Sequence, residues 1–115
     1  MINVINGQAI AQTKWQIIQR NPTSITIYRD GATLAAQTVR ITVDSRGINQ
    51  AENEAGGRMS ERACIVHGIR QHPTVTDTDI RVNDRFAIGE TSYEVYEIII
   101  LPGGIQAMCR RWSGY

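Results

Sequence analysis

The chain has 115 residues and a formal net charge of +1. This length corresponds to one domain, residues 1–115, with a core large enough to fold without metal or disulfide staples. The near-neutral charge argues against a sequence-reading nucleic-acid domain, which normally carries a basic stripe. There is no stretch of about 18 apolar residues, and Met1-Ile2-Asn3 lacks the basic start of a signal peptide, so we expect a cytoplasmic chain without a membrane partner.

The basic residues are almost all arginine. Eleven of the twelve are Arg, and Lys14 is the exception. Arginine binds carboxylates and phosphates through two parallel hydrogen bonds and is enriched at interfaces, where lysine is depleted. Codon bias in a GC-rich genome explains the same composition equally well.

A helix is predicted over residues 7–20, because apolar residues recur there at helical spacing and glutamines occupy the other side. Asn6 can cap its start, and the Asn21-Pro22 pair ends it. A helix this short is marginal alone, so we expect it to dock on a sheet and to cover residues 98–101. The docking stripe is Ile10, Ala11, Trp15, Ile17 and Ile18.

Two strands are predicted next, over residues 24–29 and 33–43, joined by the hairpin signal Asp30-Gly31. From residue 44 to residue 61 the apolar period disappears, which predicts a long mobile loop. A loop longer than about 12 to 15 residues in a small domain is usually functional or disordered. Residues 62–70 then predict another strand.

Residues 79–112 predict a three-stranded meander. The Gly89-Glu90 turn separates the first two strands, and Pro102-Gly103-Gly104 separates the last two. The expected core side chains are Phe86, Val95 and Ile99. The apolar run over residues 98–101 predicts cover on both faces of its strand, by the helix or by another subunit.

Together these elements predict a mainly β fold: a small antiparallel β-barrel or sandwich of five to six strands, with one short N-terminal amphipathic helix and one long loop.

Residues with potential chemistry do not form a recognisable centre. Cys64 and His67 lack a known zinc spacing and point to opposite faces of a strand. A cysteine nucleophile with a histidine base would need an orienting third group and an oxyanion loop, and neither is recognisable. We expect Cys64 and Cys109 to be two buried thiols, with side-by-side packing left open. The sequence therefore predicts no enzyme, no catalytic or metal-binding residues and no cofactor.

Two stretches resemble the head-closure (stopper, head–tail joining) proteins of long-tailed bacteriophages. They are PTSITIYRDG with LAAQTVRI behind it, and NDRFAIGETSYEVYEIIILPGGIQAMCRRW. The second contains a D-x-F strand at residues 84–86, a turn at Gly89, a Y-E-V strand at residues 93–95 and P-G-G at residues 102–104. The resemblance covers most of the chain.

The resemblance implies a structural virion protein of the phage neck, made in the host cytoplasm. It would form a ring of twelve copies that joins the portal and adaptor proteins to the tail terminator or tail tube. The ring would help to retain packaged double-stranded DNA, which lies in its channel. An adaptor or a tail terminator at the same neck remains an alternative.

A β-barrel module that binds single-stranded nucleic acid is a second alternative, since such modules stack bases on aromatic side chains beside a basic groove. Tyr28, Tyr93, Tyr96 and Trp112 are available but are predicted to lie on different strand faces.

Two groups of candidate site residues follow from the neck hypothesis. The loop could reach into the ring and form a gate, with glycines for rearrangement and charges that meet DNA or adjacent copies. Its candidate residues are Arg46, Gly47, Glu52, Glu54, Gly56, Gly57 and Arg58. The candidate contacts with neighbours are Trp15, Ile98, Ile100, Arg110, Arg111, Trp112 and Tyr115, and the C-terminal residues are predicted to reach a neighbour instead of folding back.

Overall fold

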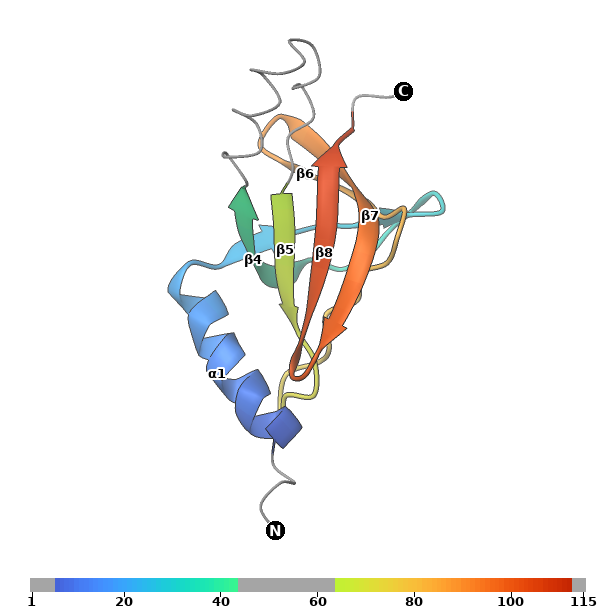
Figure 1. Ribbon diagram of the computed structural model, residues 1–115. Helices are drawn as coiled ribbons and strands as arrows, with labels where there is room; N and C mark the ends of the chain where they lie inside the picture. Colours follow the sequence, from blue (N-terminus) through green and yellow to red (C-terminus); the bar gives the residue numbers. More distant parts are fainter. Residues whose placement is uncertain (1–5, 44–63, 113–115) are drawn as a thin grey trace, which may run out of the picture.

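The computed structural model describes residues 6–43 and 64–112 and shows a mainly β protein, an antiparallel sheet curled into a half-barrel with a helix beside it (Figure 1). This confirms the predicted fold class. The elements in order are α1 (Asn6–Arg20), β1 (Thr23–Ile25), β2 (Tyr28–Arg29), β3 (Ala32–Thr33), β4 (Gln37–Val43), β5 (Cys64–Ile69), β6 (Arg85–Ile88), β7 (Thr91–Leu101) and β8 (Gly104–Arg111). The predicted loop over residues 44–61 lies outside the described residues.

The order of the strands explains the curl. It is β1-β4-β5-β8-β7-β6-β2-β3, and every neighbouring pair is antiparallel. β1 lies at one edge and β2 lies next to the other, yet only Thr26 and Ile27 separate them in the chain. This short segment therefore joins the two ends of the sheet and wraps it around a core.

The same segment corrects the predicted strand count. The strand expected over residues 24–29 is divided into β1 and β2, and the one expected over residues 33–43 is divided into β3 and β4. Each predicted strand bends where the chain changes partners, since β1 pairs with β4 while β2 pairs with β6. The amide of Leu34 donates to the carbonyl of Ile27 at 2.9 Å and holds the two bends together. Six predicted strands thus become eight.

Tight turns lie where the sequence predicts them. Asp30 and Gly31 both have positive φ, 51° and 80°, as the favoured two-residue hairpin turn requires. Gly89 has a φ of 63° in the turn between β6 and β7. Pro102 and Gly103, with a φ of 70° at Gly103, connect β7 to β8. The meander β6-β7-β8 is therefore confirmed.

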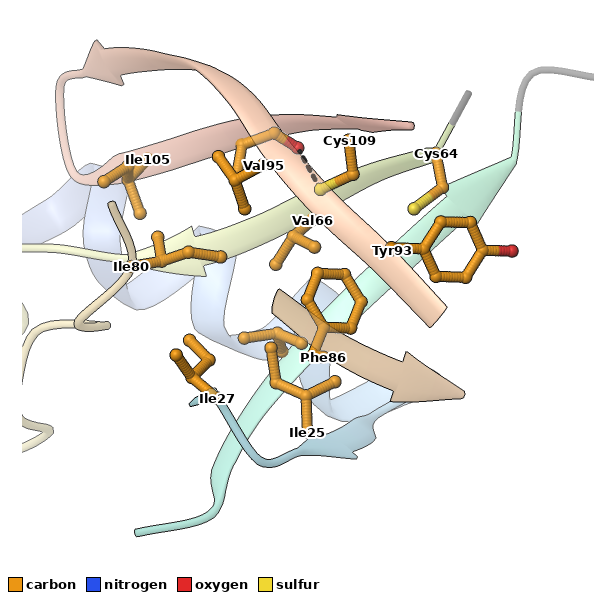
Figure 2. Close-up of a cluster of buried hydrophobic side chains, with 12 residues drawn as sticks. Ile25, Ile27, Cys64, Val66, Ile80, Phe86, Tyr93, Val95, Ile105 and Cys109 are labelled. Carbon is orange, nitrogen blue, oxygen red and sulfur yellow. Dashed lines mark hydrogen bonds between the residues drawn. The ribbon is translucent and has the colours of Figure 1, made fainter. Parts of the chain in front are cut away.

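The core fills the concave side of the curled sheet (Figure 2). The rings of Phe86 and Tyr93 stack with centroids 5.6 Å apart. Phe86 and Val95 are fully buried, as predicted. The other buried members of the cluster are Ile25, Ile27, Val39, Cys64, Val66, Ile80, Ile105, Ala107 and Cys109.

Ile99 was expected in the core, and this prediction is wrong. β7 pairs Val95 with Cys109 but Glu97 with Met108, so Tyr96 is an extra residue in a β-bulge. A one-residue bulge reverses which side chains face inward. Ile98 therefore packs against the core, and Ile99 points to the other face.

The helix does not cover the whole of residues 98–101 as predicted, although Leu101 lines a pocket with Lys14, Ile17 and Ile18 of the helix. α1 packs on β4, β5 and β8, and Ile100 remains 57% exposed. On the helix, Ala11 and Ile18 are buried, whereas Ile10 and Ile17 of the predicted stripe are exposed. A Cβ at Gly103 would lie 2.6 Å from the backbone nitrogen of Ala11, so the glycine permits the close approach of the helix.

Among the described residues, the structure has no helix that is long and apolar enough to cross a membrane.

Candidate interaction surface

A row of side chains crosses four strands on the convex face of the sheet. Tyr28 on β2 is paired with Arg85 on β6, Arg85 with Glu94 on β7, and Glu94 with Arg110 on β8. All four point outward, because the residues next to them along each strand are core residues. The carboxylate of Glu94 lies 3.6 Å from Nε of Arg85 and 3.9 Å from Nη2 of Arg110. Glu94 thus lies between two arginines, within ion-pair distance of both.

Aromatic rings flank both arginines. The guanidinium carbon of Arg85 lies 4.0 Å from the ring centroid of Trp112, and that of Arg110 lies 5.5 Å from the ring of Tyr96. Both distances fall within the range of cation–π attraction. We call the six residues Tyr28, Arg85, Glu94, Tyr96, Arg110 and Trp112 the aromatic–arginine face.

This face is exposed and carries positive charge. Tyr28 is 53% exposed and Tyr96 is 45% exposed, although large aromatic side chains are usually more buried. Two arginines of the face surround one carboxylate; Arg111 is also exposed, but it is paired with the core residue Tyr93 and is directed to the other face of the sheet. A hollow of ≈ 300 Å³ lies between Tyr28 and Trp112. The arrangement suits a partner that offers carboxylates together with one apolar group.

Trp112 is fixed on its own sheet. Its backbone amide donates to the carbonyl of Ser92 at 2.8 Å, and its side chain is half-buried beside Arg85. The predicted neighbour contact at the C-terminal end therefore follows an ordered strand, with Arg110 exposed on the same face as the tryptophan and Arg111 exposed on the other. Tyr115 lies outside the described residues.

The other predicted contact residues do not lie together. Ile98 packs against the core, and Ile100 is exposed near the turn at the opposite end of β7 from Tyr93. Trp15 meets the ring of His72 edge-on at 6.1 Å and lines a groove of ≈ 630 Å³ between residues 34–38 and 75–79. The seven candidate gate residues at positions 46–58 all lie outside the described residues.

An ion-pair network joins β2 to the segment before β6. The guanidinium of Arg29 donates to the buried Asp84 from Nε at 2.9 Å and Nη2 at 2.8 Å, and to Asp79 from Nη1 at 3.2 Å and Nη2 at 2.9 Å. The amide of Arg81 also donates to Asp84, at 2.7 Å. These bonds raise the pKa of Arg29, and the hydrogen bond from Arg29 lowers the pKa of Asp79. The network fixes Tyr28 and Arg85 relative to each other.

The thiols of the chain face one another in the core. Cys64 and Cys109 are directly paired across β5 and β8, and both are free and buried. The Cys109 thiol donates to the carbonyl of Ala107 at 3.4 Å, and the adjacent Cys64 thiol together with burial raises the pKa of Cys109. His67 is on β5 with its side chain on the other face, hydrogen-bonded through Nε2 to the hydroxyl of Thr42 at 3.1 Å. Among the described residues, no group of three or more His, Cys, Asp or Glu could hold a metal ion.

The sequence analysis did not single out Tyr28, Arg85, Glu94 and Tyr96 as members of one surface. The Gly89-Glu90 turn was a signal that pairs Arg85 with Glu94, but the bulge at Tyr96 decides that Glu94 meets Arg110. Comparison of the chain with protein-family models, curated proteins and solved structures finds no match.

Proposed function

We propose that this chain is a structural component of the neck of a long-tailed bacteriophage. Copies form a ring that joins the portal and adaptor proteins to the tail and helps to retain packaged DNA. The aromatic–arginine face is the observation that carries the proposal. Trp, Tyr and Arg are the residue types most enriched among interface hot spots, and here they are gathered on one exposed surface. The sequence resemblance supports the identity of the assembly.

The face is pre-organised for binding. Its members are held by adjacent strands, and the Arg29 network fixes the β2 side of the row. A surface that is ordered before association loses less conformational entropy when it binds. Its excess of positive charge favours an acidic partner, either the next copy in the ring or an adjoining neck protein. Such a contact, repeated around a ring, suits a permanent joint.

Variants of the face test the proposal in particles. We expect deletion of the gene for this chain to yield filled heads without tails, alongside free tails. Supplying the wild-type chain, or a control with Arg20→Ala at the exposed end of α1, restores joining. Supplying a chain with Trp112→Ala and Arg110→Ala does not. Electron micrographs of lysates measure the outcome, and normal tailed particles without the gene overturn the proposal.

Binding of single-stranded nucleic acid is a second candidate function, favoured by one observation. Of the four aromatic residues considered above for stacking, Tyr28, Tyr96 and Trp112 lie on the convex face beside arginines, and Tyr93 is in the core. Glu94 in the centre of the row repels phosphates and weakens this candidate. Salt-dependent binding of an oligonucleotide, lost when Arg110 and Arg111 are replaced by Gln, would support it.

A further inference from the structure

A second cluster of positive side chains lies in a pocket between α1 and the sheet, away from the aromatic–arginine face. Figure 1 shows α1 beside β4 and β5, and the pocket has a volume of ≈ 190 Å³. Lys14 comes from the helix, and Arg40, His67 and Gln106 come from three neighbouring strands, directly paired in that order. The remaining lining residues are Ile17, Ile18, Gly68, Leu101 and Ile105.

The pocket contains cationic groups without a counter-charge. None of the described residues that line it is acidic. Within residues 6–43 and 64–112, Lys14 and Arg40 form no ion pair. Nε of Arg40 is a buried donor without a hydrogen-bond partner in the same residues. A buried donor with no acceptor destabilises a folded protein, and so do like charges that face one another out of water.

The pKa of His67 responds to the same excess of positive charge. Burial lowers the pKa of His67, and the positive charges of Arg40 and Lys14 lower it further. The hydroxyl of Thr42 adds a hydrogen bond but no charge. An anion in the pocket would accept from Arg40, neutralise Lys14 and favour the protonated imidazole.

We propose that this pocket binds a small oxyanion, a phosphate or carboxylate group, held by Arg40 and Lys14. Nε of Arg40 and the ammonium of Lys14 donate to the oxygens, with the amide of Gln106 beside them. Ile17, Leu101 and Ile105 form an apolar wall that limits the ligand to a few heavy atoms. The site does not depend on the proposed neck function. Gln106 and Arg110 are both on β8, but the pocket and the aromatic–arginine face share no residue.

Titration of the two histidines by NMR tests the proposal on the full chain. We expect 20 mM inorganic phosphate or acetate to raise the pKa of His67 by about one unit relative to chloride of equal ionic strength. His72 is the internal control, because it lies outside the pocket and should not respond. A short DNA duplex distinguishes a free anion from a backbone phosphate, which we expect not to enter.

The outcomes separate clearly. A saturable rise at His67 with either small anion supports the site. No shift, an equal shift at His72, or a shift with the duplex alone overturns it.

Two variants make the test independent of the histidine. In phosphate, the melting temperature of the wild type should rise with anion concentration, because a ligand that binds only the folded state stabilises it. Arg40→Gln and Lys14→Gln should remove most of this rise, and Arg20→Gln, a matched loss of charge at the exposed end of α1, should retain it. If Lys14→Gln, on the helix surface, keeps the full rise, the proposal is wrong.

Discussion

Arg29 and Arg40 show two uses of one residue type within a single sheet. Arg29 donates four hydrogen bonds to two carboxylates, and one of these, Asp84, is only 1% exposed. Arg40 is also partly buried, yet its Nε has no partner among the described residues, and the pocket that it lines with Lys14 and His67 contains no acidic residue among them. The charge of Arg29 is compensated within the fold, whereas Arg40 gains a counter-charge only when the proposed anion binds.

The difference shows that burial alone does not reveal what an arginine does. A paired guanidinium ties together segments that are distant in sequence and becomes costly to remove. An unpaired buried guanidinium destabilises the fold, and a ligand that accepts its hydrogen bond removes this destabilisation. The predictions below separate these two cases, beginning with the largest expected effect.

Removal of one member of the Arg29–Asp84 pair should destabilise the protein most. Arg29→Met leaves Asp84 buried without its counter-charge, and such changes cost about 3 to 5 kcal/mol. Urea unfolding at pH 7 measures the loss. The matched control Arg20→Met, at an exposed position, should stay within about 0.5 kcal/mol of the wild type.

A double-mutant cycle shows whether the pair itself is responsible. Arg29→Met combined with Asp84→Asn should cost clearly less than the sum of the single changes, because no buried charge is left unpaired. Additive effects would mean that the two side chains act separately and would contradict the comparison.

Acid should weaken the same network through Asp79. The hydrogen bond from Arg29 lowers the pKa of this carboxylate below its ordinary value of 3.8. A depressed folded-state pKa contributes stability above the unfolded pKa, and this contribution is lost as the pH falls through the folded one. The melting temperature should therefore decrease as the pH is lowered below about 4, and it should decrease less steeply in Asp79→Asn. Because the Asp79 side chain is 51% exposed, the effect should be modest and reduced by salt. Identical pH profiles would contradict it.

Arg40→Met should change the free energy of unfolding in the opposite direction to Arg29→Met. The substitution keeps an apolar stem of similar length and removes a buried donor without a partner. In buffer without phosphate or carboxylates, we expect stability to stay unchanged or to rise by up to about 1 kcal/mol. Thermal unfolding in chloride measures this change. A loss comparable to that of Arg29→Met would show that Arg40 already has a partner in the free protein.

Local rules predicted local features well. The turn at Asp30-Gly31, the meander, and the burial of Phe86 and Val95 follow from turn chemistry and alternation, which depend on near neighbours in sequence. The Arg29–Asp84 pair joins residues 55 positions apart, so no local pattern contains it.

The errors have a common physical origin in the curvature of the sheet. A strand that changes edges must bend, which divided two predicted strands, and the bulge at Tyr96 shifted the pattern from Ile99 to Ile98. Neither the bend nor the bulge can be recognised from the amino-acid composition of the strand in which it occurs. For this reason the sequence predicted Trp112 and Arg110 as candidate contacts but could not place them on one surface with Tyr28, Arg85 and Glu94.

Glu94→Gln should have the smallest effect on stability and separates the two candidate functions of the aromatic–arginine face. The ion pairs of Glu94 are 3.6 and 3.9 Å long and involve exposed arginines, so their loss should cost at most about 1 kcal/mol and less at high salt. The substitution also removes the carboxylate that lies between Arg85 and Arg110, so the net charge of the surface becomes one unit more positive. If the face binds a protein neighbour, tail joining should weaken because the row is no longer ordered before contact. If it binds nucleic acid, affinity for an oligonucleotide should instead increase, since a carboxylate no longer repels the phosphates. Electron micrographs measure tail joining, and fluorescence anisotropy measures oligonucleotide binding. A face that binds a protein neighbour predicts weaker joining, whereas a face that binds nucleic acid predicts tighter oligonucleotide binding. A variant that joins tails normally and binds the oligonucleotide more tightly would favour nucleic-acid binding over the neck function.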